Sequence, residues 1–299
     1  MANPEFPDKK YRSLHDSEKF DNGAEDVKRL AALVKKQEIR EQLTKNDLVF
    51  LYELDTPIEA VGPLGMKDPR IEELRETRDT NADLSILFDC APEDIARSVS
   101  EISKRTKAYI GKLEPSMFDL LPRTVEYVYT EFPEGRIRFR TIELGTGISD
   151  GVSFKKTLEE QGMKMMNSYV VEMLERPDFK VVGKHENIEL VEMSVATLGF
   201  KKGARYDKIC KRAIELGLQL CPAEVGPQLR LQYQNQPKSE TLHIAMRAIR
   251  VPYLGANILT VYGGLWLGLD DGTLAAKWGP GARIVFLRPR EFPEGGEGG

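Results

Sequence analysis

The sequence predicts an α+β fold in which a helical N-terminal region is followed by a mainly antiparallel β-sheet with a few helices. Apolar residues in the first hundred positions recur at helical spacing, whereas later segments alternate between apolar and polar residues. Gly, Pro, Asn and Asp separate these alternating segments, as turns between strands require. The 299 residues are 41% hydrophobic and 30% charged, which is typical of a globular chain with one large or two modest domains.

Composition divides the chain into four expected regions. A flexible polar arm is expected over residues 1–22, and a helical region over 23–105. An α+β domain is expected over 106–290, and a disordered Gly/Glu tail over 291–299. The first third is acidic and the remainder weakly basic, which suits two regions with different roles.

The first expected helix lies in GAEDVKRLAALVKKQEIREQL, and its apolar side chains form one stripe. Helical spacing places Val27, Leu30, Ala31 and Val34 on this stripe, with charged residues on the other face. We therefore expect these four residues to be buried.

Caps and breaks mark the other expected helices of this region. Asn46 or Asp47 would cap a helix in NDLVFLYELD, and VGPLG then breaks the chain. Asp68 would cap the next helix, with Pro69 in its first turn. Two further helices are expected in ADLSILFDC and APEDIARSVSEISKR.

The α+β domain is expected to open with a hairpin. RTVEYVYTEF and IRFRTIEL alternate in polarity and flank the turn PEGR. Helices are expected in SFKKTLEEQG, NSYVVEMLE and YDKICKRAIELGL, the last having an apolar face of Tyr206, Ile209, Cys210, Ala213 and Leu216. Strands are expected in DFKVVG, NIELVEMSV, LRLQY, TLHIAMRAI, ANILTVYGG, LWLGL and ARIVFLRP.

TIELGTGISDG, residues 141–151, looks like the glycine-rich loop of an adenosylmethionine or dinucleotide site. In such folds the preceding strand is buried on both faces and is continuously apolar. Here Arg138 and Arg140 interrupt that strand, which is typical of a half-exposed antiparallel strand. We therefore expect no cofactor at Gly145 and Gly147, and we assign both glycines a conformational role.

Four residues could serve as zinc ligands, but their spacing matches no compact ligand pattern: His185, Cys210, Cys221 and His243. We therefore expect no metal and interpret Cys210 as a small core residue. Cys221 and His243 could also form a nucleophile–base pair, with Glu224 as an acid or base. Nothing in the local sequence activates the thiol, so no catalytic residue is assigned.

The candidate binding residues lie between positions 201 and 230. The basic members could bind an anion near a helix N-terminus, although a solvated face would look the same: Lys201, Lys202, Arg205, Lys208, Lys211 and Arg212. Glu224 and Arg230 complete the set. With Gly226 and Pro227 forming a tight turn between helix and strand, this pair is either an ion pair at a corner or the rim of a polar pocket.

Composition, together with the lack of a convincing catalytic or metal motif, predicts a cytoplasmic binding or interaction protein of unknown ligand, with a protein or small molecule as its partner and no catalytic centre. The net charge of −4 does not favour nucleic acid, and no apolar run approaches the roughly 20 residues that span a membrane. Three cysteines and a polar N-terminus fit a reducing compartment. The alternative is an enzyme that acts on a phosphorylated or nucleic-acid substrate through the basic site around residues 201–230. Tyr262, Trp266 and Trp278 are either core residues or a binding platform.

Two segments have the character of known sequences: NDLVFLYELDTPIEAVG with the following DPRIEEL stretch, and the region centred on LGLQLCPAEVGPQLRLQY. They resemble a family of uncharacterised proteins predicted from uncultivated bacteria. That family has no assigned activity, so the resemblance implies a bacterial origin and kinship, and it supplies no catalytic residues.

Overall fold

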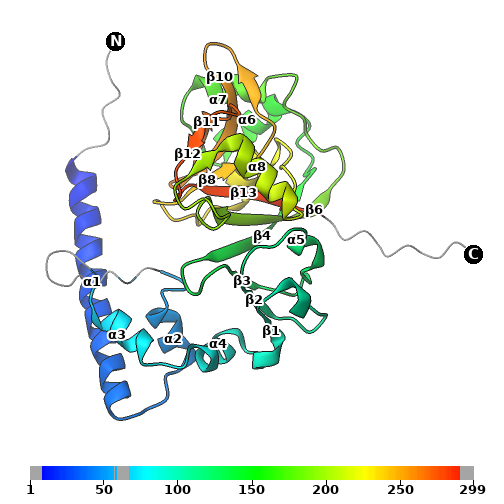
Figure 1. Cartoon of the computed structure of the whole chain (residues 1–299). Coiled ribbons are helices and arrows are strands. Elements are labelled where there is room, and N and C mark those ends of the chain that lie inside the picture. Colours follow the sequence, from blue (N-terminus) through cyan, green and yellow to red (C-terminus); the bar gives the residue numbers. More distant parts are fainter. Residues whose placement is uncertain (1–8, 57, 59–66, 290–299) are drawn as a thin grey trace, which may run out of the picture. The chain divides into compact units, whose positions relative to one another are not determined.

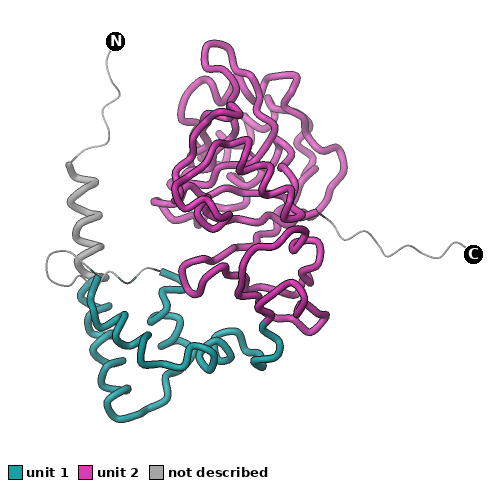
Figure 2. Tube along the Cα trace, in the orientation of Figure 1, with its two compact units in different colours: residues 1–95 teal, residues 96–299 magenta. Residues whose placement is uncertain are grey.

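The chain divides into two compact units. The computed structural model describes residues 9–56, 58 and 67–289, and the units are Met1–Ile95 and Ala96–Gly299 (Figure 2). The division falls earlier in the chain than the boundary expected after residue 105. Helices dominate the first unit and a mainly antiparallel sheet the second (Figure 1), so the α+β class is confirmed.

The described part of unit 1 is helical, with α1 (Lys9–Glu38), α2 (Lys45–Leu51), α3 (Arg70–Glu76) and α4 (Thr80–Phe88). Helix α1 begins well inside the stretch expected to be a flexible arm; residues 1–8 lie outside the described part. Its buried stripe also differs from the expected one. Leu30 and Leu33 are buried and Val34 is half-buried, whereas Val27 and Ala31 are exposed, in a helix that contacts α3.

The helix caps differ from the expected ones by one to three residues. Thr44 caps α2, and Asp47 is the third helical residue, whose carboxylate accepts the Thr44 N–H at 2.9 Å. This reciprocal arrangement is a capping box, in which two unpaired donors are satisfied at once. The Asp68 carboxylate accepts the Arg70 N–H at 3.1 Å, from one residue before the N-cap position, which Pro69 occupies. The expected break at VGPLG lies outside the described residues.

The segment APEDIARSVSEISKR is not the α-helix that its sequence suggests. It forms two 3₁₀ turns, Pro92–Asp94 and Val99–Glu101, around the short strand β1 (Ile95–Ala96). Pairing of β1 with β2 (Ala108–Ile110) requires extended backbone. The Glu101 carboxylate also accepts the Arg97 N–H at 2.7 Å, and a helix would direct that donor to a carbonyl.

Unit 2 contains a twisted mixed sheet. Within the described residues the strand order is β1-β2-β3-β4-β6-β13-β8-β10-β11-β5, with β9 beside β10, and β12 pairs separately with β7. Most pairings are antiparallel, and β2–β3, β8–β13 and β5–β11 are parallel. The remaining strands are β3 (Tyr127–Tyr129), β4 (Arg136–Leu144), β5 (Lys164–Met165), β6 (Glu186–Ser194), β7 (Ala204–Arg205), β8 (Thr241–Ile244), β9 (Ile249–Val251), β10 (Gly255–Tyr262), β11 (Trp266–Asp271), β12 (Lys277–Trp278) and β13 (Arg283–Arg288).

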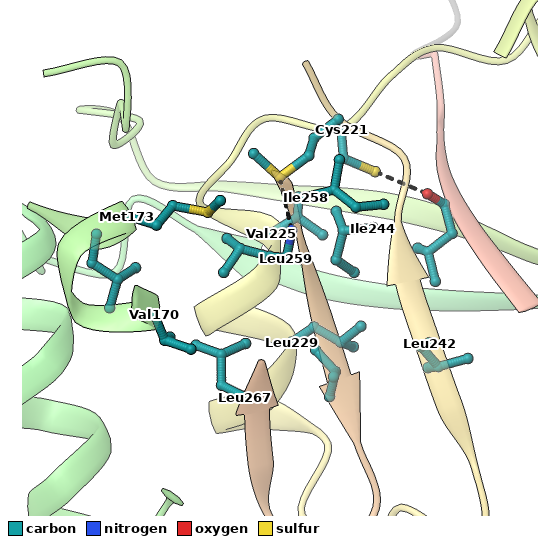
Figure 3. Close-up of a cluster of buried hydrophobic side chains, with 14 of the residues drawn as sticks. Val170, Met173, Cys221, Val225, Leu229, Leu242, Ile244, Ile258, Leu259 and Leu267 are labelled. Carbon is teal, nitrogen blue, oxygen red and sulfur yellow. Dashed lines mark hydrogen bonds between the residues drawn. The ribbon is translucent and has the colours of Figure 1, made fainter. Parts of the chain in front are cut away.

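Helices supply a hydrophobic core on each face of this sheet. The helices are α5 (Met117–Leu120), α6 (Gly151–Glu160), α7 (Ser168–Leu174), α8 (Tyr206–Glu215) and α9 (Val225–Gln232). On one face α6, α7 and α9 form the α9-side core, part of which is shown in Figure 3. On the other face α5 and α8 form the α8-side core. Side chains along β6 point alternately to the two faces of the sheet. Ile188 and Leu190 belong to the α9-side core, and Val191 and Met193 belong to the α8-side core.

Several expected elements of unit 2 are confirmed, including the β3–β4 hairpin and helices α6, α7 and α8. DFKVVG, at 178–183, is not a strand. The Val182 N–H donates to the carboxylate of Glu224 at 2.5 Å instead of to a neighbouring strand.

LRLQY is also not a strand, because it forms the second half of helix α9. Every residue from Val225 to Leu231 is buried, so α9 presents no polar face. Leu229 and Leu231 flank the buried Arg230, and this arrangement resembles strand alternation in the sequence. Gly226 and Pro227 lie in the first turn of the helix and do not form the expected tight turn.

Candidate functional site

The structure separates the basic candidate residues into two groups. Four lysines have no ion-pair partner among the described residues and are exposed: Lys201, Lys202, Lys208 and Lys211. The two arginines are engaged nearby. Arg205 pairs with Asp207 at 2.9 Å, and Arg212 donates to the Leu113 carbonyl at 2.7 Å. The apolar face of α8 is buried as expected, so the lysines form a solvated surface.

Glu224 and Arg230 do not form the expected ion pair. Both are fully buried, but they lie six positions apart, which places them about 120° apart around the α9 axis. Arg230 donates to the Gln236 side chain at 2.6 Å, to the Tyr262 carbonyl at 2.8 Å and to the Tyr233 carbonyl. Its guanidinium therefore ties the chain after α9 to the end of β10.

Glu224 instead holds two loops against the start of α9. Its Oε1 accepts the Gly145 N–H and the Gln228 side-chain amide, both at 3.0 Å, while its Oε2 accepts the Val182 N–H. Gly145 has φ +62°, and a Cβ there would lie 2.3 Å from the Lys184 carbonyl oxygen. The glycine is thus needed for its backbone conformation and for a close approach of two loops.

A cavity of about 500 Å³ lies beside the start of α9. Three chain segments line it: 178–182 without Phe179, Cys221 to Ala223, and Arg247 to Arg250. Most of its lining is apolar, with contributions from Val181, Val182, Ala223, Ala248 and Ile249. None of the eight candidate binding residues lines this cavity, although Glu224 fixes the position of Val182 in its wall.

Positive charge dominates the polar part of the cavity lining. Lys180, Arg247 and Arg250 are exposed there, and none has an ion-pair or hydrogen-bond partner among the described residues. Asp178 is the acidic residue of the lining. Three cations and one carboxylate around an apolar cavity produce a positive potential that attracts anions. Sequence analysis missed these cations because they come from segments that are far apart in the chain.

Cys221 borders the cavity but is not an activated nucleophile. Its side chain is buried, and Sγ donates to the Val285 carbonyl at 3.5 Å (Figure 3). Burial raises the pKa of the thiol, which keeps it protonated at neutral pH. His243 makes its contacts elsewhere, with Nδ1 3.2 Å from Thr260 Oγ1.

The four residues weighed as zinc ligands do not converge. No group of three or more His, Cys, Asp or Glu side chains that could hold a metal exists within the part of the chain that the structure describes. His185 is exposed and lies 3.5 Å from the Glu143 carboxylate. Cys210 packs against the α9-side core, where burial raises its pKa to about 11.

The three C-terminal aromatic residues have different environments. Trp278 is packed, with its ring 4.4 Å from that of His243 in an edge-to-face arrangement. Trp266 is 37% exposed and has the Lys164 ammonium 5.2 Å from its ring centroid. The Tyr262 hydroxyl donates to Asp270 at 2.8 Å. Trp278 is thus a packing residue, and Trp266 is the exposed member of the set.

A polar cluster on β8, β10 and β11 centres on Asp270. One carboxylate oxygen accepts the hydroxyls of Thr260 and Tyr262, each at 2.8 Å, and lies 3.1 Å from His243 Nδ1. The strand register places Thr260 directly opposite His243, which the sequence alone could not show. Burial raises the pKa of Asp270, but hydrogen bonds from His243, Thr260 and Tyr262 outweigh it, so the pKa is lower than usual.

The lowered pKa of Asp270 predicts that the cluster stabilises the folded protein less in acid. Because the Asp270 pKa is lower in the folded state, its contribution is fully present above about pH 4 and is lost as pH falls through the folded pKa. We expect Asp270→Asn to cost about 1–3 kcal/mol at pH 7 and less at pH 3. Urea unfolding of both proteins across this pH range measures the difference. As a control, the substitution Asp271→Asn at an exposed position should leave the free energy of unfolding equal to that of the parent at every pH. A cost of Asp270→Asn that does not change with pH would contradict the lowered pKa of Asp270.

Comparisons with protein-family models, with curated proteins and with solved structures found no match. The resemblance to the bacterial family therefore stays a prediction. No helix among the described residues has the length and apolar character needed to cross a membrane.

Proposed function

We propose that unit 2 is a non-catalytic binding module whose cavity beside α9 takes an anionic ligand with an apolar part. The observation that carries this proposal is the set of three unpartnered cations around a largely apolar lining. A carboxylate or phosphate would supply the missing counter-charge to Lys180, Arg247 and Arg250. The apolar part of the ligand would cover Val181 and Ile249, as in most small-ligand sites.

The chemistry of the lining supports binding more than catalysis. The Cys221 thiol has a raised pKa, and Asp178 is exposed at the surface. The alternative remains an enzyme acting on a phosphorylated or nucleic-acid substrate through the basic site around residues 201–230. Its four exposed lysines would attract a polyanion only weakly, because exposed charges are screened within about 8 Å at physiological salt.

Partners and location form part of the proposal. We infer a protein or small-molecule partner, with nucleic acid not favoured by the net charge of −4 and no membrane partner. None of the three cysteines is in a disulfide, which supports a location in a reducing compartment such as the cytoplasm. A bacterial source is inferred from the sequence resemblance alone.

The test uses phenyl phosphate as an anionic probe with an apolar ring, and phenol as its neutral counterpart. Isothermal titration should show that the parent binds phenyl phosphate and not phenol. The Arg247→Gln, Arg250→Gln variant should bind about tenfold more weakly or worse, since two charge-assisted hydrogen bonds are lost. Both arginines are exposed, so its thermal melt should match that of the parent.

The matched control removes the same charge from the exposed surface of α8. Lys208→Gln, Lys211→Gln should fold normally, because neither side chain is needed for packing, and should bind phenyl phosphate like the parent. Loss of binding in this control, with binding retained in the cavity variant, would support the enzyme alternative. Absence of binding by the parent would overturn the proposal.

A further inference from the structure

Strand β9 has an open edge. It pairs with β10 through three residues, Ile249 to Val251, and no other described strand pairs with it. Ile249 and Val251 are buried, whereas Arg250 is exposed. An unpaired edge presents backbone donors and acceptors that can template a further strand.

The hydrogen-bond pattern shows which backbone groups point to this edge. The Ala256 carbonyl accepts the Gly272 N–H at 3.0 Å, so the polar backbone groups of Ala256 face β11. Arg250 lies opposite Ala256 in the antiparallel ladder, and this is therefore a non-hydrogen-bonded pair. The N–H and C=O of Arg250 consequently point away from β10. Neither has a hydrogen-bond partner among the described residues.

The open edge borders the candidate cavity. Ala248, Ile249 and Arg250 line the cavity together with the stretch 178–182. The backbones of Lys180 and Val181 also form no hydrogen bond within the part of the chain described. DFKVVG has the alternating character of a strand but no strand partner. On two sides of the cavity, backbone groups therefore have no hydrogen-bond partner among the described residues.

The turn that follows β9 carries an exposed aromatic residue in an unfavourable conformation. The Leu254 N–H closes the turn on the Val251 carbonyl at 3.3 Å, and Pro252 is its second residue. Tyr253, the third residue, has φ +61°, where turns of this kind favour Gly. Its side chain is fully exposed, and Leu254 is 44% exposed. Such a strained, exposed aromatic residue supports a contact with a partner.

We propose that an extended acidic peptide segment of a partner protein adds to the open edge of β9 as a further strand. This inference rests on the proposed function and names the class of its ligand. Side chains of an added strand alternate between two faces. Acidic residues on one face would meet Lys180, Arg247 and Arg250, while apolar residues on the other would cover the apolar part of the lining. Main-chain hydrogen bonds to Arg250 supply affinity, as in other cases of strand addition.

The test probe is an acetylated, amidated peptide of alternating Glu and Val, six residues long. Its controls are the Lys–Val peptide and a Glu–Val peptide that is N-methylated at every second residue. We expect the Glu–Val peptide to bind the full chain, and both controls to bind at least about tenfold more weakly. Tyr253→Ser, Leu254→Ser should also weaken peptide binding without changing the thermal melt, because both side chains are exposed.

Amide hydrogen exchange followed by NMR gives the direct readout. The Glu–Val peptide should slow exchange of the Arg250 amide by tenfold or more, whereas phenyl phosphate should leave that rate unchanged. Equal binding of both N-methylated and unmethylated peptides, or an unchanged Arg250 exchange rate, would overturn strand addition. Binding of phenyl phosphate without the Glu–Val peptide would overturn this inference and leave the proposed function standing.

The same binding experiments distinguish two further outcomes. If neither phenyl phosphate nor the Glu–Val peptide binds, the proposed function fails together with the inference. If a single-stranded RNA hexamer binds in a manner lost on Arg247→Gln, Arg250→Gln, and the peptide does not, the partner is a polynucleotide and the peptide inference is overturned.

Discussion

Glu224→Ala is expected to lower the free energy of unfolding of unit 2 by about 3–5 kcal/mol. The Glu224 carboxylate is fully buried and accepts hydrogen bonds from Gly145, Val182 and Gln228. Its removal leaves the half-buried N–H groups of Gly145 and Val182 without acceptors, and the buried Gln228 amide keeps only its hydrogen bond to Thr146 Oγ1. Each lost acceptor costs about 1–3 kcal/mol, partly relieved by local rearrangement. Urea denaturation at pH 7, followed by circular dichroism, measures the loss.

Two control variants show whether the loss of stability is specific to the buried Glu224 carboxylate. Glu224→Gln keeps one acceptor oxygen and the side-chain volume, so we expect it to lose less stability than Glu224→Ala. Glu215→Ala removes an exposed carboxylate at the end of α8 and should cost less than 1 kcal/mol. A loss below 1 kcal/mol for Glu224→Ala would show that the two loops are held by other contacts.

Arg230→Ala is expected to have an effect of similar size, for a different reason. The guanidinium is fully buried, and its hydrogen bonds go to neutral acceptors on Tyr233, Gln236 and Tyr262. Burial lowers its pKa because the charged form is desolvated. Truncation leaves both a void and unsatisfied acceptors, which together cost about 3–5 kcal/mol.

Comparison with Arg230→Met divides that loss into its two parts. Methionine fills much of the void and removes the cost of burying a charge, but it cannot donate to the three acceptors. We therefore expect Arg230→Met to lose about half as much stability as Arg230→Ala in the same urea titration. Equal losses would assign the whole effect to the hydrogen bonds. A stabilised Arg230→Ala variant would contradict the structural role.

Helix α8, which has one polar face, could be predicted from the sequence, and helix α9, which is buried from Val225 to Leu231, could not. In α8, charged residues alternate with Ile209, Ala213 and Leu216 at helical spacing, so its position and its buried face were both predicted. Helix α9 is buried on every side and has no such contrast. Its Leu229, Arg230 and Leu231 therefore resembled a strand, and the charge at position 230 suggested solvent where there is none.

The candidate site was less predictable than the fold. Its cations at positions 180, 247 and 250 become neighbours only when the segment after α7 packs beside the start of α9 and the stretch that enters β9. The sequence did contain one relevant signal, because the corner around Glu224 is predicted to be either an ion pair or a pocket rim, and Cys221 to Ala223 do line the cavity. The predicted contact between Glu224 and Arg230 is wrong, since the two side chains bind backbone groups in different places. Register and loop packing, which decide such contacts, are not encoded in local periodicity.

The two faces of the central sheet have a consequence for how unit 2 folds. Strand β6 contributes Leu190 to one core and Val191 to the other. If β6 leaves the sheet, both hydrophobic cores are therefore exposed to solvent. Strand β4 does the same along its length, with Ile137 on the α8 side and Ile142 on the α9 side. Unit 2 therefore behaves as a single cooperative element, in which a defect introduced on one face lowers the melting temperature of both.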